Sequence, residues 1–286
     1  MNEVGPDYRR NGERIRMSKS HDPSERDLVQ AIEGNMFEFF MNFRRWREAE
    51  IHDDPDMLWS ITSIPFPLFN SVLRAKLEPQ NVDAVIEATL SRYKARDVPM
   101  MWWTGPATRP KNLGTALVAH GLVSEEGDSP GMAADLRTLN ENSTGPPRFD
   151  MELVKDAESL GAWAETLLAA CSMPGFVAKA MFHLCTSLGY GKASMMRHYY
   201  GRLDGEGVAT SSLFLAAGVA RIYNVSTLPR ARHQGIGAAM TLEPLREARA
   251  LGYTIGVLTS TQLGVGVYRR IGFEEYCKVG QYVWIK

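Results

Sequence analysis

The stretch of sequence that decides the fold is Arg230-Ala231-Arg232-His233-Gln234-Gly235-Ile236-Gly237-Ala238. A strand-like apolar run precedes it at 219–225, and apolar residues at helical spacing follow it. Two glycines at a helix start let the backbone approach a ligand closely, because they lack a Cβ atom. The first N–H groups of a helix have no partner inside it and carry the positive end of its dipole. The stretch therefore predicts a phosphate-binding loop, with Arg230 and Arg232 as mobile positive charges beside it.

The order of the glycines separates this loop from two other phosphate loops. The G-x-G-x-x-G order of dinucleotide-binding proteins is missing, and no Gly-Lys-Ser/Thr of a nucleotide triphosphate loop follows. Residues 254–260 predict a second strand, because they are rich in β-branched residues and follow the turn 251–253. A short helical segment ends at Gly272-Phe273, and a last strand is expected at 280–285.

Strand, R-x-x-G-x-G and helix in this order resemble the acetyl-CoA pyrophosphate loop of the GNAT N-acetyltransferase superfamily. Arg232, Gly235 and Gly237 take the motif positions, and Tyr268 with Gly272-Phe273 fits a second motif, Y-x-x-x-G-F. The resemblance covers about residues 148–286, with the specific motifs within 225–273. It implies an α/β (α+β) fold of the GNAT type, with a mixed, mostly antiparallel central sheet flanked by helices.

The resemblance also implies a site for acetyl-CoA as co-substrate, without a metal. The strand 219–225 would splay from 254–260, so that the pantetheine arm pairs with the exposed edge and a backbone N–H polarises the thioester. Thr261 stands where the family often has Asn, and its hydroxyl can still bond the arm. The residues implied in cofactor binding are Val225, Ser226, Thr227, Arg230, Arg232, His233, Gln234, Gly235, Ile236, Gly237, Ala238 and Thr261.

Tyr268 is the implied catalytic residue, as the general acid that protonates the departing thiolate. The alternative is a helix residue that only packs on the sheet. No general base stands out. His198, Glu206, Tyr223 and Asn224 are possible neighbours, and a chain of waters or an already neutral amine would serve equally.

Composition bounds the class of protein. The 286 residues are 44% hydrophobic, enough for one large or two modest cores, and the formal net charge of −1 points to no nucleic-acid partner. No apolar stretch could span a membrane, and residues 1–27 lack the apolar core of a secretory signal, so a flexible extension is expected there. The three cysteines and six histidines show no metal-ligand spacing, and a reducing, cytoplasmic setting fits them.

A run of turn-forming residues at 140–147 predicts a linker between an N-terminal domain, 28–139, and the GNAT domain, 148–286. Strand 98–103 and helix 113–119, ending at Gly121-Leu122, mirror the second motif of the C-terminal half. The N-terminal half lacks R-x-x-G-x-G and carries Leu117 where Tyr268 would stand. We therefore expect a degenerate GNAT-like half, without its own acyl-CoA site, that walls the acceptor cleft.

Two local expectations concern helices. Apolar residues between 28 and 50 predict one long helix, with Met36-Phe37-Glu38-Phe39-Phe40 in the core. Pro244 lies inside the helix that follows the phosphate loop, and we expect it to kink or break that helix beyond its first two turns.

The leading hypothesis is an N-acetyltransferase that moves an acetyl group from acetyl-CoA to a primary amine by direct attack in a ternary complex. The acceptor would be a small molecule or a peptide. One alternative is a non-catalytic acyl-CoA-binding or scaffold protein, and another is an aminoacyl or longer-chain acyltransferase of tandem GNAT type.

Overall fold

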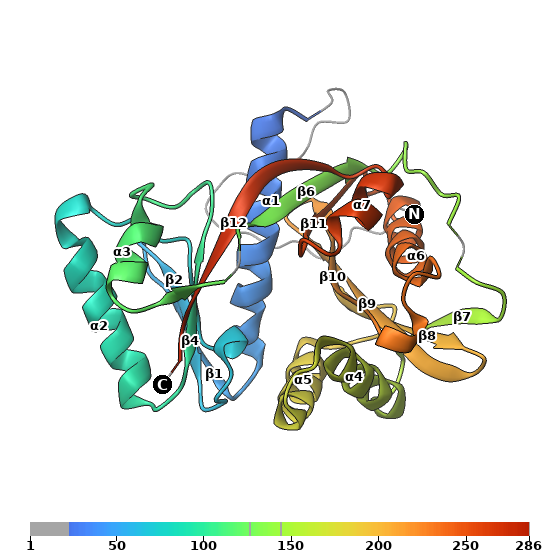
Figure 1. Ribbon diagram of the computed structural model, residues 1–286, viewed down its shortest axis with the longest axis horizontal. Helices are drawn as coiled ribbons and strands as arrows, with labels where there is room; N and C mark the ends of the chain where they lie inside the picture. Colours follow the sequence, from blue (N-terminus) through green and yellow to red (C-terminus); the bar gives the residue numbers. More distant parts are fainter. Residues whose placement is uncertain (1–22, 126, 144, 286) are drawn as a thin grey trace, which may run out of the picture.

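The structure is a computed structural model that describes residues 23–125, 127–143 and 145–285. Its described strands form one mixed sheet of twelve, in the order β1-β2-β3-β4-β12-β6-β11-β10-β9-β8-β7, with β5 beside β12. Most neighbours are antiparallel, and helices cover the sheet (Figure 1). The expected fold class is confirmed.

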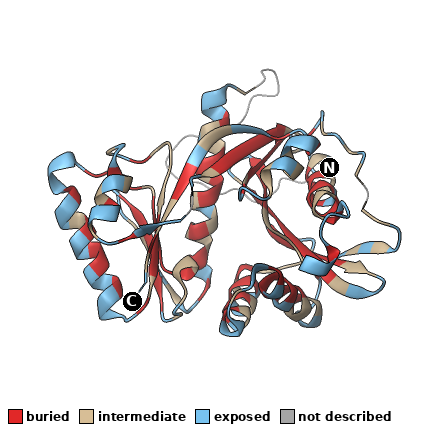
Figure 2. Cartoon of the chain, viewed as in Figure 1, coloured by how far each residue is buried: buried red, intermediate tan, exposed pale blue. Residues whose placement is uncertain are grey.

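The C-terminal half contains the strands expected at 219–225 and 254–260, observed as β10 and β11. It contains β7 (Phe149–Leu153), α4 (Ala157–Cys171), α5 (Gly175–Leu188), β8 (Met196–Leu203), β9 (Glu206–Ala216), β10 (Val219–Thr227), η4 (Pro229–Ala231), α6 (Ile236–Ala250), β11 (Ile255–Thr259), α7 (Val265–Ile271) and β12 (Glu274–Trp284). Alternation along β8 puts Tyr199 against α6 and Tyr200 against α4, so the sheet lies between these helices. Figure 2 shows the resulting buried strip along the strands.

The N-terminal half has a shorter sheet with its own core. It contains α1 (Glu25–Met41), η1 (Asn42–Arg45), β1 (Ala49–Asp53), β2 (Leu58–Thr62), η2 (Pro67–Phe69), β3 (Ser71–Leu73), η3 (Pro79–Asn81), α2 (Val82–Ala95), β4 (Met100–Thr104), α3 (Leu113–Ala119), β5 (Val123–Ser124) and β6 (Ser129–Asp135). Buried residues of β2 and β4 pack against α2 and α3. The helix α1 leaves this half and lies against β6, β11 and β12.

The two halves repeat one parallel unit. In the N-terminal half, β3 pairs parallel with β4 through the crossover helix α2, with Val72 opposite Trp102. In the C-terminal half, β10 pairs parallel with β11 through α6, with Arg221 opposite Val257. A short helix follows each unit, α3 and α7. Leu117 of α3, which stands where Tyr268 would stand, is fully buried and packs in the core.

Strands are shared between the halves. β6 precedes the 140–147 segment in sequence but pairs with β11 and with the first part of β12. The last part of β12, Gly280–Trp284, pairs with β4. The division into 28–139 and 148–286 stays a prediction, and each of these segments contributes a strand to the other's sheet.

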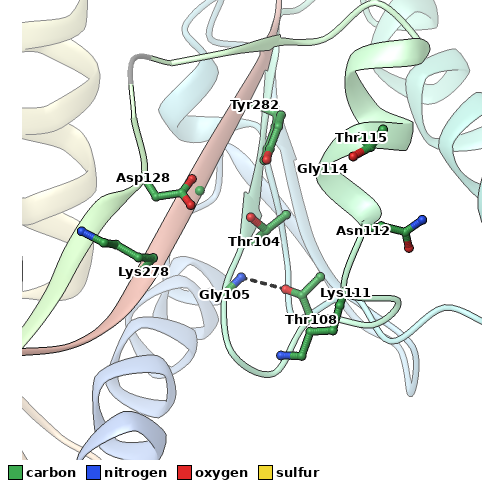
Figure 3. Close-up of a pocket in the computed structure, with 11 residues that line it drawn as sticks. Thr104, Gly105, Thr108, Lys111, Asn112, Gly114, Thr115, Asp128, Lys278 and Tyr282 are labelled. Atoms are coloured by element: carbon green, nitrogen blue, oxygen red, sulfur yellow. Dashed lines mark hydrogen bonds between the residues drawn. The ribbon is translucent and has the colours of Figure 1, made fainter.

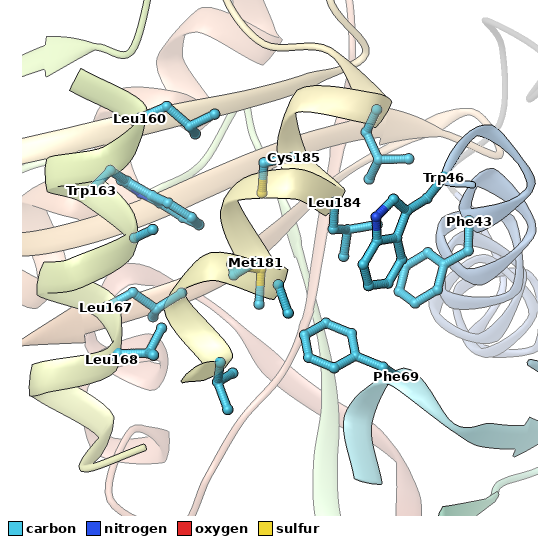
Figure 4. Close-up of a cluster of buried hydrophobic side chains, with 14 of the residues drawn as sticks. Phe43, Trp46, Phe69, Leu160, Trp163, Leu167, Leu168, Met181, Leu184 and Cys185 are labelled. Atoms are coloured by element: carbon cyan, nitrogen blue, oxygen red, sulfur yellow. The ribbon is translucent and has the colours of Figure 1, made fainter. Parts of the chain in front are cut away.

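A hydrophobic cluster also joins the halves (Figure 4). Phe43, Trp46 and Phe69 of the N-terminal half pack in one buried cluster with Leu184 and Cys185 of α5. Aromatic side chains bury large apolar areas, so this contact binds α5 firmly to the N-terminal half.

Two helix expectations were wrong, and one core expectation is confirmed. The helix expected at 28–50 ends at Met41, where the Asn42 side chain donates to the Glu38 carbonyl, and β1 follows. At its other end α1 begins at Glu25, inside the segment predicted as an extension, and residues 1–22 lie outside the described chain. Met36 and Phe40 are buried in the core, as expected.

Pro244 does not break α6, which runs without interruption from Ile236 to Ala250. The lost hydrogen bond of one proline costs about 3 kcal/mol in a helix interior. Pro244 is itself buried between Leu242 and Leu245, which are fully buried in the core. Burial of each leucine side chain contributes about 1.5–3 kcal/mol, which offsets that cost.

Removal of residues 280–286 should strongly destabilise the whole protein, because β4 then loses its partner in β12 and Val283 leaves the core. Removal of residues 285–286 alone should change the melting temperature little, because this deletion leaves the strand intact. Thermal unfolding of the two truncated chains measures the difference. Equal melting temperatures would show that the end of β12 does not stabilise the N-terminal half.

Candidate active site

The centre of the candidate site is a fork between β10 and β11. The two strands pair only at Ala220–Gly256 and Arg221–Val257. Beyond this point β10 continues along β9, while β11 continues along β6. Within the described chain, the edge of β10 that faces β11 therefore has no strand partner after Arg221. Such an edge offers backbone donors and acceptors to an extended ligand.

A bulge in β10 shapes this edge. The register with β9 shifts between Tyr223 and Ser226, and Asn224 has a left-handed φ of 55°. Thr210 fixes the bulge, because its hydroxyl donates to the Asn224 carbonyl at 2.8 Å and lies 2.7 Å from the Ser226 hydroxyl. Val225, Ser226 and Thr227 are thus held on the open arm of the fork, half-buried.

The phosphate loop follows this arm directly. His233 and Gly235 have φ values of 63° and 80°, and Gly235 is the N-cap residue of α6. The first intrahelical bonds run from Ala238 and Ala239 to the Gly235 carbonyl, each 3.1 Å long. Among the described residues, no backbone acceptor meets the N–H groups from His233 to Gly237. These groups, including those of Gln234 and Ile236, are free to donate at the start of a 15-residue helix, and phosphate binding there stays a prediction.

The two arginines of the loop have partners within the protein. The Arg232 guanidinium donates to the carbonyls of Thr227 (3.0 Å) and Ala170 (3.1 Å). It is therefore not a mobile charge but ties the loop to the ends of β10 and α4. Arg230 forms an exposed ion pair with Glu206 at 3.0 Å. Such pairs contribute only about 0–1 kcal/mol, so an anionic ligand can compete for Arg230.

Tyr268 lies on α7 and is half-buried, with its ring centroid 6.0 Å from that of Phe273. Burial raises the pKa of Tyr268 to about 12, so its phenol keeps its proton at neutral pH. A Cβ atom on Gly264 would lie only 2.9 Å from the Tyr268 ring, which explains the glycine there. Thr261 is exposed in the turn that precedes this helix.

The structure excludes His198 as a base. Its side chain is fully buried, with Nδ1 2.8 Å from the Ser212 hydroxyl and its ring 4.4 Å from Trp163. Burial lowers the pKa of His198 to about 3. Glu206 is paired with Arg230 in the β8–β9 turn.

The other two neighbours do not supply a base either. Burial raises the pKa of Tyr223 to about 12, and Asn224 donates to Ser212 at 3.2 Å. The side chains placed on this arm of the fork are therefore not proton acceptors at neutral pH.

Arg221 is a residue that the motifs did not indicate. It is one of the largest fully buried side chains and stands at the last paired position of the fork. Its guanidinium donates to the Ile32 carbonyl of α1 at 2.8 Å and to the Thr259 hydroxyl of β11. It also lies 4.8 Å from the centre of the Tyr223 ring. The sequence signal that could have identified Arg221 is its charge in the middle of the apolar run 219–225.

Aromatic side chains of the N-terminal half lie beside the fork. The Phe39 ring is 4.7 Å from Tyr223, and Phe40 is 6.1 Å from Trp103 of β4. Phe39, Tyr223 and Trp103 are each half-buried. That the N-terminal half forms one wall of the acceptor cleft stays a prediction.

The corresponding fork in the N-terminal half is filled by the protein's own backbone. After β3 and β4, Lys76 and Arg109 form a parallel bridge. Arg109 donates to Ala75 and Leu77 donates to Arg109, each at 2.9 Å. The carboxylate of Glu33 holds the filling loop, because both of its oxygens accept the Ala107 N–H at 3.0 Å. Within the described residues, this pairing leaves no open strand edge at the N-terminal fork.

Comparisons with known proteins agree with this geometry at the level of the fold. Neither a family model nor a curated protein matches the sequence. A GCN5-related N-acetyltransferase from Kribbella flavida superposes with a TM-score of 0.67 at 20% identity, over 88% of this chain and 95% of that chain. One from Sphaerobacter thermophilus gives 0.62 at 14% identity, over 92% and 93%. A tandem GNAT protein from the clavulanic acid biosynthesis pathway gives 0.56 at 10% identity, over 91% and 94%.

The chain has the GNAT fold. The similarity covers nearly the whole chain, so both halves belong to the superposed architecture. Within the described residues of this GNAT fold, no group of three or more His, Cys, Asp or Glu side chains could hold a metal ion. None of the described helices is both long and apolar enough to cross a membrane.

Because His198 is buried, we expect the folding stability of this protein to decrease at acid pH. Its pKa in the folded protein, about 3, lies below the value of about 6.5 in an unfolded chain. The unfolded state therefore binds more protons between these values, and stability falls as pH drops below about 6.5, by about 2 kcal/mol between pH 7 and pH 5. Denaturant unfolding of His198→Gln should show a correspondingly smaller loss over this range. His183→Gln, at an exposed position, is the control and should keep the wild-type loss.

Proposed function

We propose that this protein is an N-acetyltransferase that transfers an acetyl group from acetyl-CoA to a primary amine of a small molecule or peptide. One observation carries the proposal. The unpaired edge of β10 is followed along the chain by the start of α6, whose free N–H groups can bind an anion. The backbone N–H groups of 233–237 would bind the pyrophosphate. The edge at Val225 to Thr227 and the Thr261 hydroxyl would bind the pantetheine arm.

Different residues of the fork would act on the thioester carbonyl and on the departing thiolate. A backbone N–H near Val225 polarises the thioester carbonyl, so that the amine nitrogen attacks its carbon directly. The new C–N bond forms, the C–S bond breaks, and Tyr268 gives its proton to the departing thiolate. The proton of the amine goes to water, because the described residues of the fork present no basic side chain. Tyr268 then regains a proton from water. The amine must therefore react in its neutral form.

Substitution of Gly237 tests the anion site. A Cβ atom there meets no neighbour within 4 Å in the protein itself, so a side chain would extend into open space at the helix start. We expect Gly237→Val to fold normally and to bind acetyl-CoA at least tenfold more weakly, because the phosphates lose close approach to the N–H groups. Isothermal titration calorimetry measures the affinity.

The matched control is Gly161→Val. Gly161 also lies in a helix, α4, with open space around its Cβ position. The control should keep the wild-type affinity for acetyl-CoA. Equal affinities of the two variants would show that the loop does not bind the pyrophosphate.

Substitution of Tyr268 separates a transferase from an acyl-CoA-binding scaffold. Tyr268→Phe keeps the ring against Phe273 but removes the proton donor. A donor that acts on the leaving thiolate affects kcat and not ground-state binding. We expect kcat to fall ~10²–10⁴-fold with unchanged affinity for acetyl-CoA.

The assay measures the rate at which CoA is released from acetyl-CoA in the presence of a panel of amines. Tyr253→Phe, another half-buried tyrosine, is the control and should retain full turnover. A Tyr268→Phe variant that turns over as fast as the parent would remove Tyr268 from the reaction. Binding of acetyl-CoA without turnover of any amine would favour the scaffold.

A further inference from the structure

A polar cavity lies in the N-terminal half, apart from the β10–β11 fork. It is bounded by the end of β4, the start of α3 and the last part of β12, and its volume is about 250 Å³ (Figure 3). Cavities for drug-sized ligands typically measure 300–1,000 Å³, so this one suits a smaller molecule. Every side chain that lines it carries a polar atom, and the remaining positions are Gly105, Gly114 and Gly280. The cavity opens to solvent on the side where Asp128 and Thr115 are exposed.

Two glycines bring oxygen atoms together in this cavity. A Cβ atom on Gly280 would lie 2.4 Å from the Thr104 hydroxyl and 3.0 Å from a carboxylate oxygen of Asp128. A Cβ atom on Gly114 would lie 2.0 Å from the Tyr282 hydroxyl. Both positions thus require glycine for these oxygens to stay where they are. In Figure 3 the hydroxyls of Thr104 and Tyr282 point toward each other, and Asp128 lies beside them.

These oxygens have no partners of their own. Among the described residues, no hydrogen bond satisfies the Thr104 hydroxyl, the Tyr282 hydroxyl or the Asp128 carboxylate. The two lysines of the lining are engaged elsewhere. Lys278 pairs with Glu275 at 2.7 Å and points away from the hydroxyls, and Lys111 donates to the Pro106 carbonyl at 2.7 Å.

The wall of the cavity is held firmly. The Gly105 N–H donates to the Thr108 hydroxyl at 2.8 Å, and the Ala107 N–H donates to the buried Glu33 carboxylate. These bonds fix the same loop that fills the N-terminal fork. A preorganised site loses less free energy on binding than a mobile one.

We propose that this cavity binds the ammonium group of a small hydroxylated amine, with Asp128 as its counter-ion. A carboxylate and two hydroxyl oxygens can accept the three N–H donors of a primary ammonium. The Asp128 bond is charge-assisted, so the carboxylate distinguishes an amine from a neutral alcohol of the same shape. This site is separate from the fork and does not depend on the proposed acetyl transfer.

Calorimetric titration of the full chain, without acetyl-CoA, tests the proposal with a matched pair of probes. Serinol (2-amino-1,3-propanediol) and glycerol differ only by an amino group in place of the central hydroxyl. Serinol should bind, and glycerol at least tenfold more weakly. Asp128→Asn should weaken serinol binding at least tenfold, and Thr104→Val should weaken it severalfold while preserving shape. Asp150→Asn, which changes an exposed carboxylate of β7, should have no effect.

Three results would overturn the proposal: equal affinities for serinol and glycerol, unchanged serinol binding in Asp128→Asn, or no serinol binding at tens of millimolar. The Gly237→Val variant separates this site from the fork. It should bind serinol as the parent does, whatever its affinity for acetyl-CoA. Loss of serinol binding in Gly237→Val would place the amine at the fork and not in this cavity.

Discussion

The pairing of β12 with strands of both halves is the constraint on which the rest of the structure depends. Its first part pairs with β6 and its last part with β4, so one continuous backbone fixes the N-terminal strands relative to the C-terminal strands. The helix α1 packs against the point of exchange and carries Phe39 to Tyr223. The aromatic wall beside the fork therefore follows from strand register. A one-residue slip of β12 would turn each of its side chains to the opposite face of the sheet.

Arg221 shows how this arrangement is coupled to the fork. Burial of a guanidinium without an ion-pair partner is costly, and the described chain offers it only a carbonyl, a hydroxyl and a ring face. The contacts of Arg221 join β10, β11 and α1 at the vertex where the two strands separate. Its hydrogen bonds to α1 and β11 hold β10 at the last paired position, from which the two arms diverge.

Sequence reasoning reached the parts of the site that depend on local chemistry. Gly235 and Gly237 predicted a helix start with open N–H groups, because backbone conformation there is set within a few residues. The strands at 219–225 and 254–260 were predicted from local composition, and they correspond to β10 and β11. The role of Arg232 did not, because its acceptors are the carbonyls of Thr227 and of the distant Ala170. Pro244 does not break α6 for a similar reason, since the burial of its neighbours offsets its intrinsic cost. The exchange of β6 and β12 leaves no local signal, because the pairing partners are far apart in sequence, as with Trp284 of β12 and Met100 of β4.

The N-terminal half differs from the C-terminal half in how its fork is occupied. Eight residues connect β4 to α3, whereas five connect β11 to α7. The longer connection reaches back between the strands, and Arg109 satisfies the backbone groups that a pantetheine arm would otherwise meet. Hydrogen bonds hold the loop that fills the fork, and the outer surface of this loop forms one wall of the polar cavity. The polar groups of that cavity come from β4 and from the shared strand β12. The same strand exchange that positions the wall of the fork thus also supplies Gly280 and Tyr282 to the second site.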